Sequence, residues 1–385
     1  MGKYFSNKFK STSRRTHFGI FFGFLFLFFA VFFLFPEFFS SSISYVRSEA
    51  IIKPPKEVLK LILPPLDTVA YDKKLNELAN NPPPKPPTTK IIKDPKTGVE
   101  TTITIDPKPV PPSGWPVKTT YPNAGAILPF SRIVAYYGNL YSKKMGVLGE
   151  YEEKEMLQKL EIEVKKWEEA DPATAVVPAL HYIAVVAQGS AGKDGKYRAR
   201  MPDSEIDKVL TMAKKINAIV FLDIQVGFST IEIELPHFEK YLKLPNVHVG
   251  VDPEFSMKSD IRPGKVVGTY DATDINFVAD YLAKLVRDNN LTPKILIVHR
   301  YTQKMLTNYQ NIKPLPEVQI VMHMDGWGGK AKKINTYQQF VYKEPVQFTG
   351  FKLFYKNDIL DSGTVLFTPK ELLKLSPKPI YIQYQ

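Results

Sequence analysis

Two acidic residues, Asp252 and Glu254, are separated by one proline and directly follow a short valine-rich run, residues 247–251. Alternate residues of an extended segment point to the same side, so both carboxyl groups can enter one pocket. Two close carboxyl groups oppose each other's ionisation, and one of them can then stay protonated near neutral pH. A protonated carboxyl group is the general acid that glycoside cleavage requires. The alternatives are a pair of solvated loop acids, or an Asp252 that caps a turn before Pro253.

A third acidic residue, Asp223, ends the apolar run 219–222, and Gln225 follows two residues later on the same side. Asp223 is either the partner carboxylate of Glu254 in an acid/base pair or a buried aspartate held by backbone donors. Both interpretations stay open at the level of the sequence.

Further polar residues stand at the ends of the other apolar runs. Of the neighbours His299 and Arg300, only one can face inward. The indole of Trp327, between glycines, suits the face of a sugar ring, whereas core packing is the alternative for any single tyrosine. The candidate catalytic residues are Glu254, Asp252, Asp325 and Asp223, and the candidate ligand contacts are Tyr136, Tyr137, Asn139, Gln188, Gln225, His299, His323, Trp327, Lys352, Tyr355 and Gln383.

Several other chemistries are not indicated. His299 and His323 fall on separate predicted strands without a His-x-x-x-His spacing, so the sequence predicts no metal site. The glycine-rich stretch 188–195 lacks the Lys-Ser/Thr pair of a phosphate-binding loop, which favours a mobile loop over the pocket. There is no Gly-x-Ser-x-Gly elbow and no cysteine, which excludes disulfides and thiol catalysis. We therefore predict no cofactor.

The elements that must position these residues alternate from Arg132 onward, with short apolar runs followed by segments of helical period. We expect helices at 150–170, 203–216 and 272–288, and the segment 236–244 precedes the fourth strand. We expect strands at 133–137, 176–186, 218–224, 247–251, 294–298, 318–322, 350–354 and 379–383. Eight strands close a barrel. The predicted class is α/β, a (β/α)8 TIM barrel over residues 126–385, in which the ends of the strands line the active site.

The N-terminal part has a different composition. Residues 18–35 carry no charge and are long enough to cross a membrane, and basic residues precede them. We therefore expect a cytoplasmic segment (1–17), a transmembrane signal anchor (18–39) and an extracytoplasmic barrel, with a cleaved signal peptide as the alternative. Half of the 32 prolines lie between residues 51 and 125, which predicts a stalk over 40–125 with a small hairpin around the turn 94–98.

The positive charge is unevenly distributed. Residues 1–125 hold 17 Lys and Arg against 9 Asp and Glu, and the remaining residues hold 34 against 30. The excess therefore belongs to the anchor and stalk, where attraction to anionic lipid or cell-wall polymer explains it. The sequence does not support nucleic-acid binding.

Three runs resemble chitinase-like glycoside hydrolases. Residues 250–254 resemble the end of their strand-four motif, residues 321–325 their strand-six Met-x-Tyr-Asp, and residues 133–137 their first strand. The resemblance implies Glu254 as general acid, Asp252 orienting a substrate acetamido group, Asp325 as its strand-six partner, and the substrate's own N-acetyl oxygen as nucleophile. The sequence departs from the family at three positions, since Val247 and Gly250 replace two aspartates and Met324 replaces a tyrosine. The chain as a whole also resembles bacterial secreted and membrane-anchored proteins without an assigned activity.

These observations predict a membrane-anchored, extracytoplasmic glycoside hydrolase that acts on cell-envelope or surface polysaccharide. The alternative is a catalytically silent barrel that binds envelope glycan or a partner protein, since a fold does not fix a function.

Overall fold

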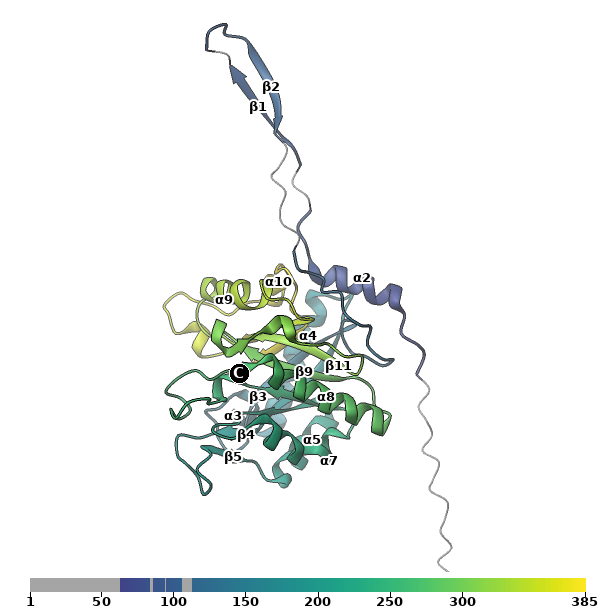
Figure 1. Cartoon of the computed structure of the whole chain (residues 1–385), viewed down its shortest axis with the longest axis vertical. Coiled ribbons are helices and arrows are strands. Elements are labelled where there is room, and N and C mark those ends of the chain that lie inside the picture. The colour runs from purple at the N-terminus through teal and green to yellow at the C-terminus, as the bar shows by residue number, and fades with distance from the viewer. Residues whose placement is uncertain (1–62, 84–85, 94, 106–112) are drawn as a thin grey trace, which may run out of the picture. The chain divides into compact units, whose positions relative to one another are not determined.

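The computed structural model describes residues 63–83, 86–93, 95–105 and 113–385. Eight parallel strands form a closed barrel (Figure 1), because β3 pairs with both its sequence neighbour β4 and the last strand, β13. A short strand, β5 (Arg198–Arg200), adds antiparallel to β4. The barrel strands are β3 (Ser131–Gly138), β4 (Ala175–Ala187), β6 (Ile219–Ile224), β7 (Val247–Val251), β9 (Lys294–Arg300), β11 (Val318–Met324), β12 (Phe348–Leu353) and β13 (Tyr381–Tyr384). The predicted (β/α)8 barrel is confirmed.

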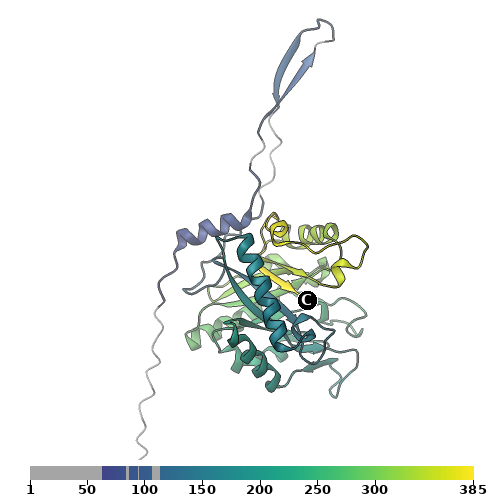
Figure 2. The ribbon, with the colours of Figure 1, turned by 180° about the vertical axis from the view of Figure 1, so that it is seen from behind.

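Helices surround the strands, and the long α4 runs along their outside (Figure 2). The main ones are α4 (Glu153–Ala170), α5 (Asp203–Lys215), α8 (Ala272–Asn289) and α9 (Lys330–Tyr337). The connection after β9 differs, since it holds only 3₁₀ turns and a two-residue strand. The short elements are α3 (Val147–Glu150), α6 (Ile231–Glu234), η2 (Leu235–Phe238), α7 (Glu239–Leu242), η3 (Pro253–Phe255), β8 (Tyr270–Asp271), η4 (Gln303–Met305), β10 (Leu306–Thr307), η5 (Tyr309–Asn311), η6 (Gln338–Tyr342), η7 (Asn357–Ile359) and α10 (Pro369–Leu372).

Local chemistry sets where the helices begin. At the start of α8, the Asp271 side chain accepts a hydrogen bond from the Thr273 N–H at 3.1 Å, and the Asp274 side chain accepts from the Asp271 N–H at 2.7 Å. This capping box satisfies N–H groups that have no partner inside the helix. The buried face of α8 then packs on the strands through residues at helical spacing, among them Ile275, Ala279 and Leu282.

Successive side chains along each barrel strand alternate between two environments. Side chains of one parity, such as Val134 and Leu222, lie in the large apolar cluster with the helices. Side chains of the other parity fill the barrel, and those near the N-terminal ends are apolar, such as Ile133, Phe221 and Ile295. Toward the C-terminal ends the inward positions become polar, which is where a barrel of this kind carries its chemistry.

Part of the predicted stalk is ordered on the barrel. Residues of α2 (Thr68–Ala79) include Tyr71, which is 3% exposed and packs in one apolar cluster with Ile133 and Phe348. These strand residues lie at the N-terminal ends, so α2 covers the end of the barrel opposite the polar one. Residues Thr68–Ala79 therefore form a helix packed on the barrel and not the extended stalk that we expected.

The hairpin also forms. β1 (Thr88–Lys93) and β2 (Glu100–Ile105) pair antiparallel, with Lys93 opposite Glu100 across the turn, and every residue of both strands is exposed. The predicted membrane segment, 18–35, lies outside the described residues. Among the described residues, the structure has no helix with the length and apolar character that crossing a membrane requires.

Candidate active site

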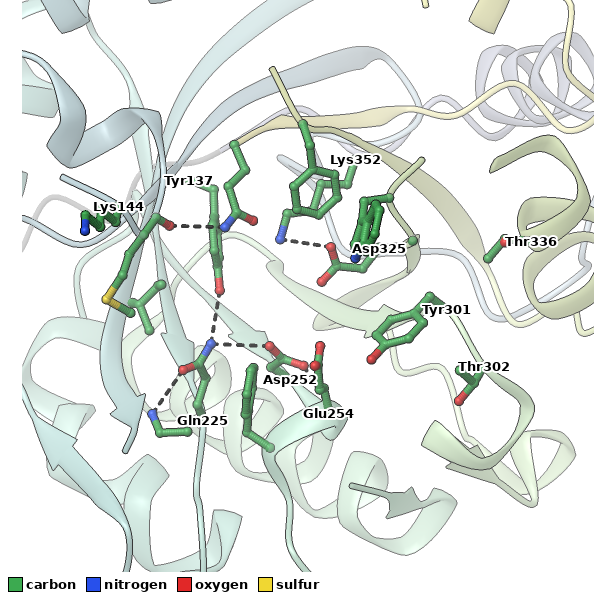
Figure 3. Close-up of a pocket in the computed structure, with 18 of the residues that line it drawn as sticks. Tyr137, Lys144, Gln225, Asp252, Glu254, Tyr301, Thr302, Asp325, Thr336 and Lys352 are labelled. Atoms are coloured by element: carbon green, nitrogen blue, oxygen red, sulfur yellow. Dashed lines mark hydrogen bonds and ion pairs between the residues drawn. The ribbon is translucent and has the colours of Figure 1, made fainter. Parts of the chain in front are cut away.

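A pocket of about 610 Å³ opens at the C-terminal end of the barrel (Figure 3). It lies where the inward positions turn polar, at the ends of strands and in the loops that follow them. Its walls are formed by Tyr137, Lys144, Met145, Ile183, Ala187, Gln225, Asp252, Glu254, Phe255, Tyr301, Thr302, Asp325, Gly326, Trp327, Lys332, Thr336, Lys352, Phe354 and Gln385.

The Asp-Pro-Glu unit forms one wall of this pocket. Asp252 caps the 3₁₀ turn η3, since its Oδ1 accepts a hydrogen bond from the Glu254 N–H at 3.1 Å. Its Oδ2 lies 3.4 Å from Gln225 Nε2. Figure 3 shows the two carboxyl groups side by side, with the Tyr301 hydroxyl directed toward Glu254. The capping role and the pocket role, which were alternatives in the sequence, are therefore combined in one residue.

Burial sets the protonation of both carboxyl groups. Burial and the nearby Asp325 carboxylate raise the pKa of Glu254, while a hydrogen bond from Tyr301 opposes this. Burial raises the pKa of Asp252 well above its ordinary value, which His299 opposes. Two adjacent carboxyl groups with raised pKa values hold a proton more readily than a solvated pair does.

Asp325 is the ionised carboxylate of the pocket. Its Oδ1 lies 2.9 Å from Lys352 Nζ, and its Oδ2 lies 2.7 Å from His299 Nδ1. Burial alone would raise the pKa of Asp325, but Lys352 and His299 lower it below its ordinary value. The pocket thus holds a charged carboxylate beside two carboxyl groups that resist charging.

Tyr137 forms the polar floor between the pocket and the barrel interior. Its hydroxyl donates to Asp223 Oδ2 at 2.8 Å, and Gln225 Nε2 lies 3.3 Å from the same hydroxyl. Lys352 Nζ lies 3.9 Å from the centre of the Tyr137 ring, a cation–π contact. These contacts fix the ring, because its hydroxyl is hydrogen-bonded and its face is covered by Lys352.

The rim of the pocket is more open. Trp327 is 49% exposed, and Lys332 Nζ lies 4.5 Å from its ring centre. A half-exposed indole beside a pocket offers an apolar face with a polar edge.

Four predicted site residues lie beneath the pocket rather than on its wall. They are Asp223, His299, His323 and Gln383, each fully buried. Of the neighbours His299 and Arg300, His299 faces inward, and Arg300 faces outward, where it pairs with Glu344. Asp223 is held by side chains, not by the backbone donors that we considered, and as a fully buried residue it does not face Glu254 across the pocket.

Four others lie outside the pocket. Tyr136 and Tyr355 pack on the outer side of the strands, with their hydroxyl oxygens 3.2 Å apart, because Tyr136 and Tyr137 are neighbours and only one can point inward. Asn139 is buried in a loop, where it donates to the Ile183 carbonyl at 3.0 Å. Gln188 does not contribute to the wall either.

Other residues of the site were not predicted from the sequence. Tyr301 follows Arg300 and shares the inward parity of His299, so the alternation of the strand could have indicated it. Lys144 comes from a loop and Lys332 from the first turn of α9, and neither position carries a comparable signal. His181 lies in the middle of β4, and with Asp223 and His299 it forms a buried group whose side-chain atoms could hold a metal ion, their ligand atoms lying within 4.8 Å of one another.

Comparisons with known proteins add little to this geometry. No protein-family model matches the chain, and no curated protein sequence matches it either. Solved structures that are similar include Burkholderia cenocepacia dihydropteroate synthase complexed with 7,8-dihydropteroate (10% identity over 67% of this chain and 86% of that chain, TM-score 0.33). Thermotoga maritima Cel5A in complex with cellobiose is similar at 10% identity, over 65% of this chain and 88% of that one, with a TM-score of 0.36. Plasmodium falciparum HPPK-DHPS with pteroate is similar at 13% identity, over 66% of this chain and 44% of that one, with a TM-score of 0.33.

Identities and scores this low transfer no residue role to this chain. The strand pairing by itself defines a (β/α)8 barrel, while the resemblance to chitinase-like hydrolases stays a prediction.

Proposed function

We propose that the pocket cleaves a glycosidic bond of a cell-envelope or surface polysaccharide, with Glu254 as the general acid. The observation that carries this proposal is the environment of Glu254. Its carboxyl group lines a polar pocket, and burial and Asp325 raise its pKa, which favours the protonated form. A carboxyl group that holds its proton near neutral pH can give it to the leaving oxygen of a sugar.

The other carboxylates take complementary roles in this proposal. Asp325 is ionised and buried, so it can stabilise the positive charge that develops on the sugar ring as the bond breaks. Asp252 resists ionisation like Glu254, so the ionised Asp325 is also the carboxylate that can accept the proton of the attacking water. Trp327, half exposed at the rim, is the surface on which a sugar ring would stack.

The experiment compares the full chain with Glu254→Gln on a panel of envelope polysaccharides, measuring new reducing ends. Glutamine keeps the size of the side chain but cannot donate the proton, so turnover should fall by at least about 100-fold. Glu161→Gln is the matched control, because Glu161 is exposed on α4. Equal turnover by the wild type and Glu254→Gln would contradict the proposal.

One observation favours the alternative, a barrel that binds glycan without cleaving it. Each oxygen of Asp325 already contacts a protein group, Lys352 or His299, and these contacts reduce the negative charge that the carboxylate can offer to a positively charged sugar ring. Glycan binding without turnover, retained in Glu254→Gln, would support this second function.

We also propose that residues 18–39 anchor the chain in a membrane with the barrel outside. Eighteen uncharged residues preceded by lysines and arginines support this placement. Fractionation of cells, followed by protease treatment of intact spheroplasts, tests it. Recovery of the intact chain in the soluble cytoplasmic fraction would contradict it.

A further inference from the structure

Beneath the pocket, three buried polar atoms lie together without hydrogen-bond partners. They are His181 Nε2, Asp223 Oδ1 and His299 Nε2, from strands β4, β6 and β9, and the three side chains are 0% exposed. An unpaired polar atom in a protein interior is costly, and native structures pair nearly all of them. Three such atoms that converge on one point therefore indicate a ligand between them.

The spacing of these atoms fits a metal ion better than hydrogen bonds. Asp223 Oδ1 lies 3.4 Å from His181 Nε2 and 3.6 Å from His299 Nε2, and the two distances are long for hydrogen bonds. Tetrahedral bonds of about 2.0–2.2 Å from zinc to nitrogen and oxygen would place neighbouring ligand atoms about 3.3–3.6 Å apart. The two separations that involve Asp223 fall in this range, and the ligand atoms of all three side chains lie within 4.8 Å of one another.

Each of the three side chains is also held from behind. His299 Nδ1 lies 2.7 Å from Asp325 Oδ2, and His181 Nδ1 lies 2.6 Å from the Tyr381 hydroxyl. The far oxygen of Asp223 accepts from Tyr137. Metal-binding histidines and carboxylates show this arrangement, because the second hydrogen bond fixes the tautomer and aims the free atom at the ion.

Space for the ion is provided by a glycine. Strand β7 passes between β6 and β9, and its Gly250 pairs in register with Asp223 on one side and Ile297 on the other. A β-carbon at position 250 would overlap His181 Nε2 and lie 2.6 Å from Asp223 Oδ1. Any other residue here would fill the space that the three atoms face.

We propose that His181, Asp223 and His299 bind one divalent transition-metal ion of the zinc class inside the barrel. Two imidazoles and one carboxylate form a donor set that such ions accept, with water at the fourth position. The ion would join three strands beneath the pocket, and through His299 it would orient Asp325. This inference is independent of the proposed glycan chemistry. The metal-free alternative is an imidazolium at His299 between Asp223 and Asp325.

The test measures zinc in the full chain, purified in mild detergent without a histidine tag. Elemental analysis should find about one zinc per chain, and refolding with Zn²⁺ after removal of metal in guanidinium and EDTA should restore it. Because the ligands are fully buried, EDTA should strip the native protein far more slowly than the unfolded one. A wild-type chain that folds but takes up no zinc by either route would overturn the proposal.

Two variants locate the ion. Gly250→Ala keeps all three ligands but fills the space, and it should lose stoichiometric zinc, as His299→Gln should. His248→Asn is the matched control, because His248 is a buried barrel histidine outside the group, and asparagine retains an acceptor for the Ile295 N–H. Zinc retained by folded Gly250→Ala and His299→Gln, or lost equally in His248→Asn, would overturn the assignment.

If the variants fail to fold, X-ray absorption at the zinc edge of the wild type identifies the side chains that bind the ion. Two imidazoles with oxygen ligands are expected, and a first shell with no imidazole, or with three, would contradict the site.

Discussion

The Lys352 ammonium lies 2.9 Å from Asp325 Oδ1, and the two side chains are only 3% and 6% exposed. This ion pair keeps Asp325 ionised. The neighbouring carboxyl groups of Glu254 and Asp252 lie in surroundings that disfavour a second negative charge. The division into one charged carboxylate and one proton-holding pair is what allows acid chemistry in this pocket.

Removal of Lys352 should destabilise the barrel. Lys352→Met leaves Asp325 with His299 as its remaining side-chain partner, and breaking a buried ion pair typically costs about 3–5 kcal/mol. Guanidinium unfolding of the two proteins measures the difference. Lys356→Met is the control, since its pair with Glu150 is solvent-exposed and should cost less than about 1 kcal/mol. An equal effect of the two substitutions would contradict a buried, paired Lys352.

Glu254→Gln should stabilise the folded chain at neutral pH. A carboxyl group whose folded pKa is raised binds protons more tightly in the folded state, so its contribution to stability is lost as pH rises from the unfolded to the folded pKa. The variant should therefore gain in free energy of unfolding at pH 7 relative to the wild type, and the gain should vanish below the unfolded pKa of glutamate. A gain independent of pH, or a loss at pH 7, would argue against a raised pKa.

Tyr301→Phe should move the alkaline limb of the activity profile upward. The Tyr301 hydroxyl hydrogen-bonds to Glu254 and lowers its pKa, so its loss should let Glu254 keep its proton to higher pH. The measurement is kcat/KM against pH on whichever glycan the wild type cleaves. An unchanged limb, or one at lower pH, would exclude this contact.

Trp327→Ala should weaken glycan binding without affecting the fold. A lost stacking contact of about 0.5–1.5 kcal/mol corresponds to a dissociation constant about 2- to 13-fold higher. Because Trp327 is half exposed, the free energy of unfolding should change by less than about 0.5 kcal/mol. Unchanged glycan affinity, measured by titration calorimetry, would remove Trp327 from the site.

The eight strands could be predicted because their outward side chains must be apolar beneath helices, and the inward ones are apolar over half the barrel. Helix α2 was missed for a physical reason. Its Tyr71, Leu75 and Leu78 have helical spacing, but the surrounding prolines dominate the composition of that segment. Short helices such as α10 depend on local caps that a pattern of hydrophobic residues does not reveal.

The sequence predicts which side chains point into the pocket when inward and outward positions are assigned strictly by the alternation along each strand. Asp252, Lys352 and Tyr137 line the pocket as expected, while Tyr136 fails because it has the opposite parity. His181 could not be recognised, since it lies inside a long apolar strand that contains a register shift between Ile183 and Val185. Its partners, Asp223 and His299, are more than 40 residues away in the sequence.

The most direct test of the acid role is the pKa of Glu254 itself, which needs no substrate. Carbon-13 NMR of the full chain labelled at glutamate side-chain carboxyls, with the Glu254→Gln variant for assignment, follows this one group through a pH titration. We expect a pKa above the ordinary value of 4.5. A measured pKa at or below 4.5 would contradict the assignment of Glu254 as the general acid.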